Sequence, residues 1–285
     1  MNKVNLYQIF ASMNRRFIWR LGRRLYLMAR NDFNGSLEAN GESWLQREVL
    51  NILRKRSINA VVFDVGANIG SWTLLLIKNA QTIHTSATLN LHAFEPFPST
   101  FSTLAGRLQN YQSGISIQCH ELALSSEDGE TYMFGKANLG TSSMHSGIKN
   151  LQLEKVKITR KKVDTYCTEN SIEEIHLLKC DAEGHDFEVI RGATSLLKNG
   201  KIWFFQFEYN HRWIYSRHYL KDVFEFIGGT RYKLSRLTSK GLEIYNHWDP
   251  ELERFFECNY VLIRDDLVNH INNWNVTLDS TNTFA

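Results

Sequence analysis

The chain has 285 residues, 43% of them hydrophobic, which is enough to bury one substantial core with residues to spare. Seven of its 33 Lys and Arg residues precede the first acidic residue, Asp32, which leaves 26 against 30 Asp and Glu, a net charge of −4, for the rest of the chain. Because the body of the chain is slightly acidic, the composition argues against a nucleic-acid-binding domain, which carries a basic patch on its folded surface.

The four cysteines lie far apart in the sequence and form no Cys-x-x-Cys pair, a pattern that favours a reducing compartment. No segment contains the roughly 18 apolar residues in a row that span a bilayer, and no short apolar run near the N-terminus ends in a cleavage site. We therefore expect a cytoplasmic protein without a membrane-spanning segment, either free or bound peripherally to the inner face of the membrane.

Apolar residues recur at three- and four-residue steps from Leu6 to Met28, and arginines repeat on an adjoining face. This periodicity predicts a basic amphipathic helix over about residues 4–30. Its apolar stripe either packs on the following domain or on a second copy of the chain, which is the more common case, or lies on an anionic membrane. A second helix carries apolar residues from Trp44 to Leu53, and we assign residues 1–58 to an N-terminal helical extension.

Short apolar runs separated by helical stretches follow, the alternation that predicts βαβ units and a mostly parallel sheet. Strands are predicted at 60–65, 89–94, 115–120, 175–180 and 202–207. Helices are predicted near 72–79, 99–109, 187–197 and 220–227. The sequence therefore predicts a doubly wound α/β domain.

The remaining segments complete this domain. The long mixed segment 131–163 is interpreted as strand hairpins and loops, and the runs 232–237 and 259–263 as a closing antiparallel pair. The end of the chain is rich in Asn and Thr, so that we expect a flexible tail over 268–285. The predicted domain therefore spans residues 59–267.

The segment DVGANIG at residues 64–70 lies where the first predicted strand turns into the first helix of the sheet. Gly66 and Gly70 let the backbone turn tightly and approach a ligand, and the following helix offers unpaired N–H groups. Asn68 takes the place of the middle glycine in Gly-x-Gly-x-x-Gly, which disfavours a nicotinamide cofactor. The turn alone predicts only a nucleotide-like ligand.

Acidic residues follow the later strands. Glu95 ends the second strand, where a carboxylate accepts hydrogen bonds from the two hydroxyls of a ribose. Asp181, Glu183 and Glu208 follow the next strands along, and because ligands gather beyond the carboxyl ends of such strands, we expect all three near the cofactor. Ion pairing with Lys179 or Arg191 is a competing explanation for one or two of them.

In this order the motifs resemble the FkbM family of methyltransferases. The matching segments, which cover about residues 60–264, are DVGANIG with Thr73, AFEPFPSTF at 93–101, ELALSSEDGE at 121–130, GTSSM at 140–144, LLKCDAEGHDFEVIRGA at 177–193 and FQFE at 205–208. The resemblance implies a Rossmann-like class I methyltransferase fold with helices on both faces of the sheet, and S-adenosyl-L-methionine as methyl donor. It also implies O-methyl transfer to a hydroxyl of a sugar, glycan or glycosylated metabolite, as in polysaccharide biosynthesis.

The resemblance also assigns the cofactor-binding residues by position. The methionine part is assigned to residues of the first turn and helix, the ribose to the acid after the second strand, and adenine to the residues after the third strand. These are Asp64, Gly66, Asn68, Gly70 and Thr73 for the first, Glu95 for the second, and Leu122 and Ala123 for the third.

Methyl transfer to an alcohol needs an aligned acceptor and a base that accepts its proton. Asp181 and His185 are the candidate bases, with Glu208 or His211 as the orienting partner. An alternative is that Asp181, Glu183 and Glu208 hold a Mg²⁺ ion that lowers the pKa of the acceptor, but we favour a site without a metal.

The stretch 209–215 mixes aromatic rings with hydrogen-bond donors, as carbohydrate sites do, although Trp213 is equally explained by packing of a helix on the sheet. The residues predicted to contact the acceptor are Glu183, His211, Trp213 and Ser143. An alternative function is a catalytically silent methyltransferase fold that binds partners in a glycan assembly complex.

Overall fold

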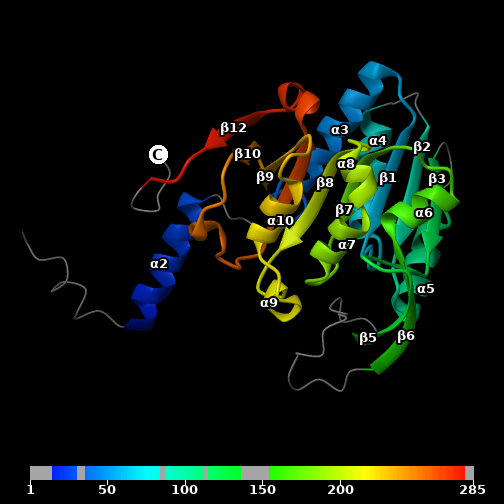
Figure 1. The fold of residues 1–285 in the computed structure, drawn as a ribbon, viewed down its shortest axis with the longest axis horizontal. Helices are drawn as coiled ribbons and strands as arrows, with labels where there is room; N and C mark the ends of the chain where they lie inside the picture. Colours follow the sequence, from blue (N-terminus) through cyan, green and yellow to red (C-terminus); the bar gives the residue numbers. More distant parts are fainter. Residues whose placement is uncertain (1–14, 31–35, 84–87, 112–114, 136–153, 280–285) are drawn as a thin grey trace, which may run out of the picture.

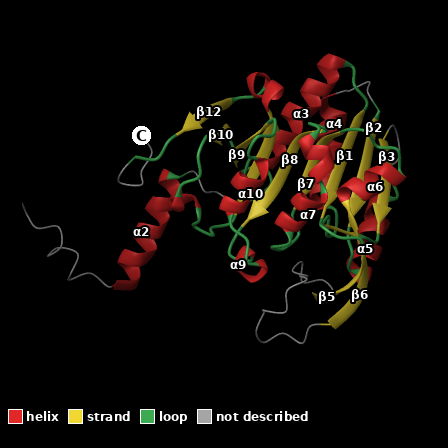
Figure 2. Ribbon diagram, in the orientation of Figure 1, coloured by secondary structure: helices red, strands yellow, loops and turns green. Residues whose placement is uncertain are grey.

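The computed structural model describes residues 15–30, 36–83, 88–111, 115–135 and 154–279. A large twisted sheet runs through the molecule with helices on both of its faces, and a small second sheet lies beside one end (Figures 1 and 2). The described part of the chain thus has the doubly wound α/β architecture that the alternation of strands and helices predicts.

Within the described residues the large sheet has nine strands in the order β12-β10-β9-β11-β8-β7-β1-β2-β3. Its strands, in chain order, are β1 (Ala60–Val65), β2 (Leu89–Phe94), β3 (Ile115–His120), β7 (Ile175–Cys180), β8 (Ile202–Tyr209), β9 (Tyr232–Thr238), β10 (Gly241–Tyr245), β11 (Cys258–Arg264) and β12 (Asn273–Val276). The first four have the bounds predicted from the sequence, and β8 continues two residues further.

Five neighbouring strands, β8, β7, β1, β2 and β3, run parallel, so that their carboxyl ends meet at one edge of the sheet. The chain first moves outward from β1 to β2 and β3, and later returns to the other side of β1 with β7 and β8. This reversal between β1 and β7 is the topological switch point at which ligands bind in open α/β sheets.

The other half of the sheet is largely antiparallel. The predicted pair is confirmed, because β9 and β11 pair antiparallel, and β11 also closes the sheet against β8. The hairpin strand β10 was not predicted, and β12 differs from the expected loose tail because residues 273–276 pair parallel with β10. A strand of four residues at the edge of a sheet leaves little periodicity in the sequence, although its backbone hydrogen bonds hold it in place.

Helices cover both faces of the sheet. The described helices are α2 (Arg15–Ala29), α3 (Glu42–Arg56), α4 (Ser71–Ile83), α5 (Pro98–Leu108), α6 (Val163–Glu169), α7 (Asp186–Gly192), α8 (Thr194–Lys198), α9 (Trp213–Ser216) and α10 (Leu220–Ile227), with short 3-10 turns η1 (Pro250–Leu252) and η2 (Asp265–His270). Helices α3, α4 and α5 contribute to one apolar cluster with the sheet, and α6, α7, α8 and α10 to another. The sheet therefore separates two cores.

Helix α3 belongs to the folded body, which differs from the expected domain boundary at residue 58. Leu45 and Leu53 are buried in the same cluster as Leu76 of α4. The side chain of Gln46 donates a hydrogen bond to the Trp72 carbonyl oxygen at 3.2 Å and accepts one from Asn79 at 2.8 Å. These contacts make α3 a layer of the α/β domain, so that only α2 remains as an appended helix among the described residues.

The single helix predicted at 187–197 is instead two short helices, α7 and α8, that meet at Ala193. At the end of α7, a Cβ atom added to Gly192 would lie 1.9 Å from the Ser125 carbonyl oxygen. The backbone of α7 therefore packs directly on the strand β4 (Ala123–Ser125), and this close approach interrupts the helix.

The small sheet consists of β4, β6 (Glu154–Lys162) and β5 (Gly129–Gly135), in the order β4-β6-β5. Strands β5 and β6 pair antiparallel, which agrees with the hairpin predicted for 131–163. Residues 136–153 of that segment lie outside the described residues. Phe97, Ala123, Met133 and Ile158 form an apolar cluster of their own, which joins this sheet to the start of α5.

Candidate functional site

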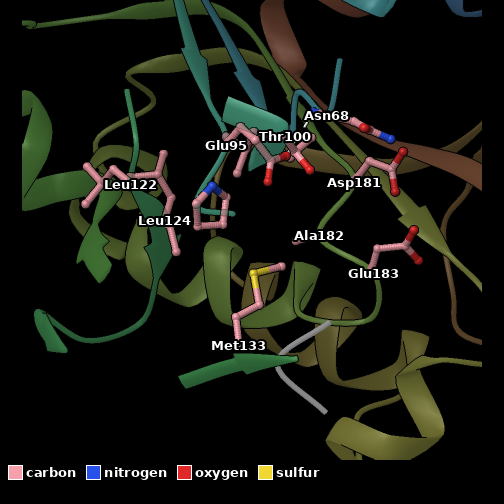
Figure 3. A pocket seen from close by; sticks show the side chains of 13 residues that line it. Asn68, Glu95, Thr100, Leu122, Leu124, Met133, Asp181, Ala182 and Glu183 are labelled. Atoms are coloured by element: carbon pink, nitrogen blue, oxygen red, sulfur yellow. Dashed lines mark hydrogen bonds between the residues drawn. The ribbon is translucent and has the colours of Figure 1, made fainter. Parts of the chain in front are cut away.

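A cavity opens at the switch point between β1 and β7 and contains about 670 Å³ of space, its open mouth included. It is lined by Val65, Gly66, Asn68, Glu95, Pro96, Thr100, Leu122, Ala123, Leu124, Met133, Asp181, Ala182 and Glu183. Figure 3 shows Leu122 and Leu124 on one side, Asp181 and Glu183 on the opposite side, and Glu95 and Thr100 between them. The cavity therefore joins an apolar wall to an acidic wall.

The turn after β1 forms the floor between the two walls. Gly66 has a φ of +70°, and a Cβ atom added to it would lie 2.0 Å from the Asp181 carbonyl oxygen. Asn68 also has a positive φ, of 50°, a conformation that is strained for residues other than glycine and gathers at functional sites. The turn thus needs glycine at position 66 because the loop after β7 packs against it.

Glu95 lies at the end of β2 and is nearly buried, with 5% of its surface exposed. One carboxylate oxygen accepts a hydrogen bond from the Asn68 N–H at 3.0 Å, and the other accepts one from the Phe97 N–H at 2.9 Å. Each oxygen keeps a further lone pair. The two backbone bonds therefore orient the carboxylate toward the cavity without using up its capacity to accept hydrogen bonds.

Burial raises the pKa of Glu95 from 4.5 to about 7, although the backbone donors and Lys179 act in the opposite direction. In the unfolded chain this carboxyl group ionises near 4.5, so rising pH first stabilises the unfolded state. The free energy of unfolding therefore falls until the pH has passed the folded-state pKa, and a pKa shift of this size corresponds to a loss of about 3 kcal/mol.

Between pH 4.5 and pH 8 the unmodified protein is expected to lose about 3 kcal/mol of its free energy of unfolding through Glu95. Glu95→Gln is expected to escape this loss because the amide does not ionise. Urea denaturation at several pH values measures the difference. A difference that stays constant over this range would contradict the assignment of the raised pKa to Glu95.

Asp64 and Thr73 were assigned to the cofactor, but neither lines the cavity. The buried carboxylate of Asp64 accepts a hydrogen bond from the Thr73 hydroxyl at 2.6 Å, and its other oxygen lies 3.3 Å from the Lys179 ammonium. Lys179 also contacts Asp181 at 3.6 Å. Asp64 therefore connects the start of α4 to the end of β1 and stabilises the turn without contacting the cavity.

Gly70 likewise lies outside the cavity lining. Its φ is +81°, and an added Cβ atom would lie 2.8 Å from a methyl group of Leu104 on α5. The glycine thus allows α4 and α5 to pack closely behind the turn. Of the five residues assigned to the methionine part, Gly66 and Asn68 line the cavity and the other three support it.

Four carboxyl groups gather beyond β7 and β8. Asp181 and Glu183 line the cavity, Asp186 is buried behind them, and Glu208 lies at the end of β8. Burial and the charge of Asp181 raise the pKa of Glu183 to about 8 and that of Asp186 to about 6. Burial, Asp181 and Asp186 likewise raise the pKa of Glu208 well above its usual value. The predicted acidic residues do converge, and they influence one another.

Arg212 balances part of this charge. Its guanidinium forms an ion pair with Glu183, which has a positive φ of 54°. A Cβ atom added to Gly184 would lie 2.8 Å from the Arg212 backbone, so the two loops are in direct contact. Ion pairing therefore holds Glu183 through Arg212 and Asp181 through Lys179, whereas Arg191 pairs with Glu188.

The apolar wall is formed by β4 together with residues that the sequence did not single out. Leu122 and Ala123, which were predicted, line it with Leu124, and Met133 of β5 completes it, whereas Thr100 of α5 lies between the two walls. Thr100 lies within the segment AFEPFPSTF, which could have drawn attention to it. Met133 has no signal in the sequence, because only the small sheet carries it to the cavity.

Of the residues predicted for catalysis or acceptor binding, four that the structure describes do not line the cavity, namely His185, Glu208, His211 and Trp213. The His185 ring is buried, with its Nε2 atom 2.9 Å from the Ser125 hydroxyl, and does not line the cavity. Trp213 is fully buried against Phe207 and Tyr209 and donates to the Glu208 carbonyl oxygen, so that its ring offers no face to a sugar. His211 is exposed, and Ser143 lies outside the described residues.

Among the residues that the structure describes, no three His, Cys, Asp or Glu side chains have the geometry of a metal site. The Glu183 side chain is paired with the Arg212 guanidinium. No described helix is both long and apolar enough to cross a bilayer.

The family model of the Methyltransferase FkbM domain matches residues 64–261. Methyltransferase 1 of Beauveria bassiana (strain ARSEF 2860) is 26% identical over 153 residues, which are 47% of this chain and 58% of that relative. The solved structure of Methyltransferase FkbM from Methylobacillus flagellatus KT aligns with 71% of this chain and 43% of its own at 16% identity, with a TM-score of 0.44. Precorrin-6y C5,15-methyltransferase from Geobacter metallireducens GS-15 aligns with 76% of this chain and 87% of its own at 9% identity, with a TM-score of 0.37. Because the matched domain covers more than half of the sequence, the chain belongs to the FkbM methyltransferase family.

Proposed function

We propose that this protein is an S-adenosylmethionine-dependent methyltransferase that methylates a hydroxyl oxygen of a sugar, glycan or glycosylated metabolite. The observation that carries the proposal is that one cavity is lined both by groups suited to a nucleoside and by two carboxyl groups suited to an acceptor. Its position at the switch point of the parallel strands, in a chain of the FkbM family, supports the same function.

The residues of the cavity fit this cofactor. The turn at Gly66 leaves no room for a side chain and brings backbone close to the cavity, and Glu95 has lone pairs left for two ribose hydroxyls. Leu122 and Leu124 offer an apolar surface to adenine. When bound, the cofactor supplies an electrophilic methyl group on its sulfonium.

The acidic wall suits the acceptor. We assign Asp181 to receive the proton of the acceptor hydroxyl, because its side chain lines the cavity, is 41% exposed and lies 3.6 Å from the Lys179 ammonium. Burial raises the pKa of Glu183 to about 8 and that of Glu208 well above its usual value, which disfavours the carboxylate form of both. Glu183, fixed by Arg212, is then able to donate or accept a hydrogen bond to a neighbouring hydroxyl of a sugar.

Calorimetric titration with S-adenosylmethionine tests the cofactor assignment. The protein is expected to bind it, and Glu95→Gln is expected to weaken binding about 10- to 100-fold through loss of hydrogen bonds to a charged acceptor. Glu225→Gln, which replaces an exposed glutamate on α10, is the matched control and leaves the affinity unchanged. Equal affinities of the Glu95→Gln variant and the unmodified protein would refute the ribose assignment.

The acceptor is tested separately by mass spectrometry of the host cell's glycans with and without the protein. The proposal predicts a species heavier by one methyl group that disappears with the protein. The alternative of a catalytically silent partner-binding module predicts cofactor binding with no methylated species in either sample.

A further inference from the structure

Helix α2 has a continuous apolar stripe that faces away from the rest of the protein. Phe17, Leu21, Leu25 and Met28 follow one another at steps of four, four and three residues, which places them along one side of the helix. Their exposed fractions are 53%, 38%, 56% and 61%, and Trp19, which lies on the other side of the helix, is exposed by 74%. Five of the eleven exposed large apolar side chains among the described residues thus lie on this one helix.

The opposite side of α2 holds the helix to the folded body. The Tyr26 hydroxyl donates a hydrogen bond to Glu251 at 2.5 Å, and the Tyr26 ring packs edge-on against Phe256. The Arg23 guanidinium lies over the same Phe256 ring at 5.2 Å. Because successive residues are turned by about 100° around a helix, Tyr26 and Arg23 point largely away from the apolar stripe. The helix is therefore attached by one side and leaves its apolar side uncovered, as its separate position in Figure 1 illustrates.

Positive charge flanks the apolar stripe. Helix α2 contains Arg15, Arg16, Arg20, Arg23 and Arg24 and no acidic residue. If the stripe packed on the same stripe of a second copy, Arg20 and Arg24 of the two helices would come close together with no carboxylate from either helix. An anionic membrane has an apolar interior that suits the stripe and a negatively charged surface that suits the arginines beside it.

We propose that α2 binds the surface of an anionic membrane and lies parallel to it. The apolar stripe enters the boundary between headgroups and acyl chains, and Arg20 and Arg24 meet lipid phosphates. A helix of 15 residues is about 22 Å long, which suits a surface-bound helix. This binding is independent of the proposed methyltransferase function and would bring the cavity to membrane-associated acceptors.

Cosedimentation of the full chain with vesicles tests the proposal. Binding is expected with vesicles of phosphatidylcholine containing about 30% phosphatidylserine, and not with phosphatidylcholine alone. Raising the salt to about 0.5 M is expected to weaken binding at least tenfold, because ions screen the arginines from the lipid charge.

Two variants separate the contributions of charge and apolar surface. The double variant Arg20→Glu with Arg24→Glu is expected to lower the partition coefficient about 30-fold or more, since each arginine contributes about fivefold near an anionic surface. Leu21→Ser with Leu25→Ser is expected to lower it at least tenfold with the charge unchanged. Arg54→Glu with Lys55→Glu reverses two exposed cations at the end of α3 and is the matched control that retains binding.

All of these side chains are exposed, so that the variants should melt at the temperature of the unmodified protein. Equal binding to neutral and anionic vesicles, or an undiminished partition coefficient of the α2 variants, would overturn the proposal. A third outcome would also overturn it: the protein does not bind vesicles but is a dimer in solution, and Leu21→Ser with Leu25→Ser converts the dimer to a monomer. The stripe would then be an interface between copies.

Discussion

Asp181→Asn is expected to lower methyl transfer about 100- to 10,000-fold, the usual contribution of a positioned general base. Asp181 is the carboxylate that both lines the cavity and contacts the Lys179 ammonium, at 3.6 Å. Of the other acids of the cluster, Glu183 is paired with Arg212 and has a pKa raised to about 8, whereas Asp186 and Glu208 do not line the cavity.

Rates measured under saturating S-adenosylmethionine, with the cell-derived acceptor, check this prediction. Cofactor affinity should change less than about threefold, because the amide keeps the size and the acceptor oxygen of the side chain. Asp265→Asn, which alters an exposed aspartate paired with Arg231, is the control that keeps full turnover. If Asp181→Asn transfers methyl groups at the normal rate and Glu183→Gln does not, the base is Glu183.

Lys179→Met is expected to lower the free energy of unfolding by about 3–5 kcal/mol, since it leaves a buried carboxylate without its partner. Asp64 is completely buried and only 3.3 Å from the Lys179 ammonium. Burial of the ammonium opposes its charge, yet Asp64, Asp181 and Glu42 together raise the pKa of Lys179 above its usual value. The lysine therefore supplies the positive charge that balances these carboxyl groups.

Urea denaturation measures this loss, with Lys233→Met, at an exposed lysine of β9, as the control that stays within about 0.5 kcal/mol. The double variant Asp64→Asn with Lys179→Met should lose less stability than the two single variants added together, because removing either charge already breaks the pair. Additive losses would show that the two charges do not stabilise each other.

The parallel strands β1, β2, β7 and β8 could be predicted from the sequence because they are almost wholly buried and therefore rich in apolar residues. In β7, for example, all six residues from Ile175 to Cys180 are buried. The prediction of secondary structure failed where the pattern of apolar residues does not reflect burial. The edge strand β12 and the break between α7 and α8 depend on neighbours that are distant in the sequence, namely β10 and β4.

Several lining residues of the cavity were predictable as neighbours, because they directly follow strands whose carboxyl ends share one edge. Gly66, Asn68, Glu95, Leu122 and Ala123 all line the cavity. The acceptor side was less predictable. From the sequence, an aromatic residue after β8 could either stack on a sugar or pack in the hydrophobic core. Trp213 packs in the core, against Phe207 and Tyr209.

By itself the sequence determined the fold class, the turn at Gly66, the acid at Glu95 and the amphipathic character of α2, since each of these depends on spacing along the chain. The tertiary structure decided which charged groups meet. Lys179 contacts Asp64 and Asp181 because β7 lies beside β1, and Arg212 contacts Glu183 because two loops pack on a glycine. It also decided that the apolar stripe of α2 stays exposed, because Tyr26 and Arg23 bind the body from the other side. Periodicity defines the faces of an element, but the contacts of each face depend on strand order and loop packing.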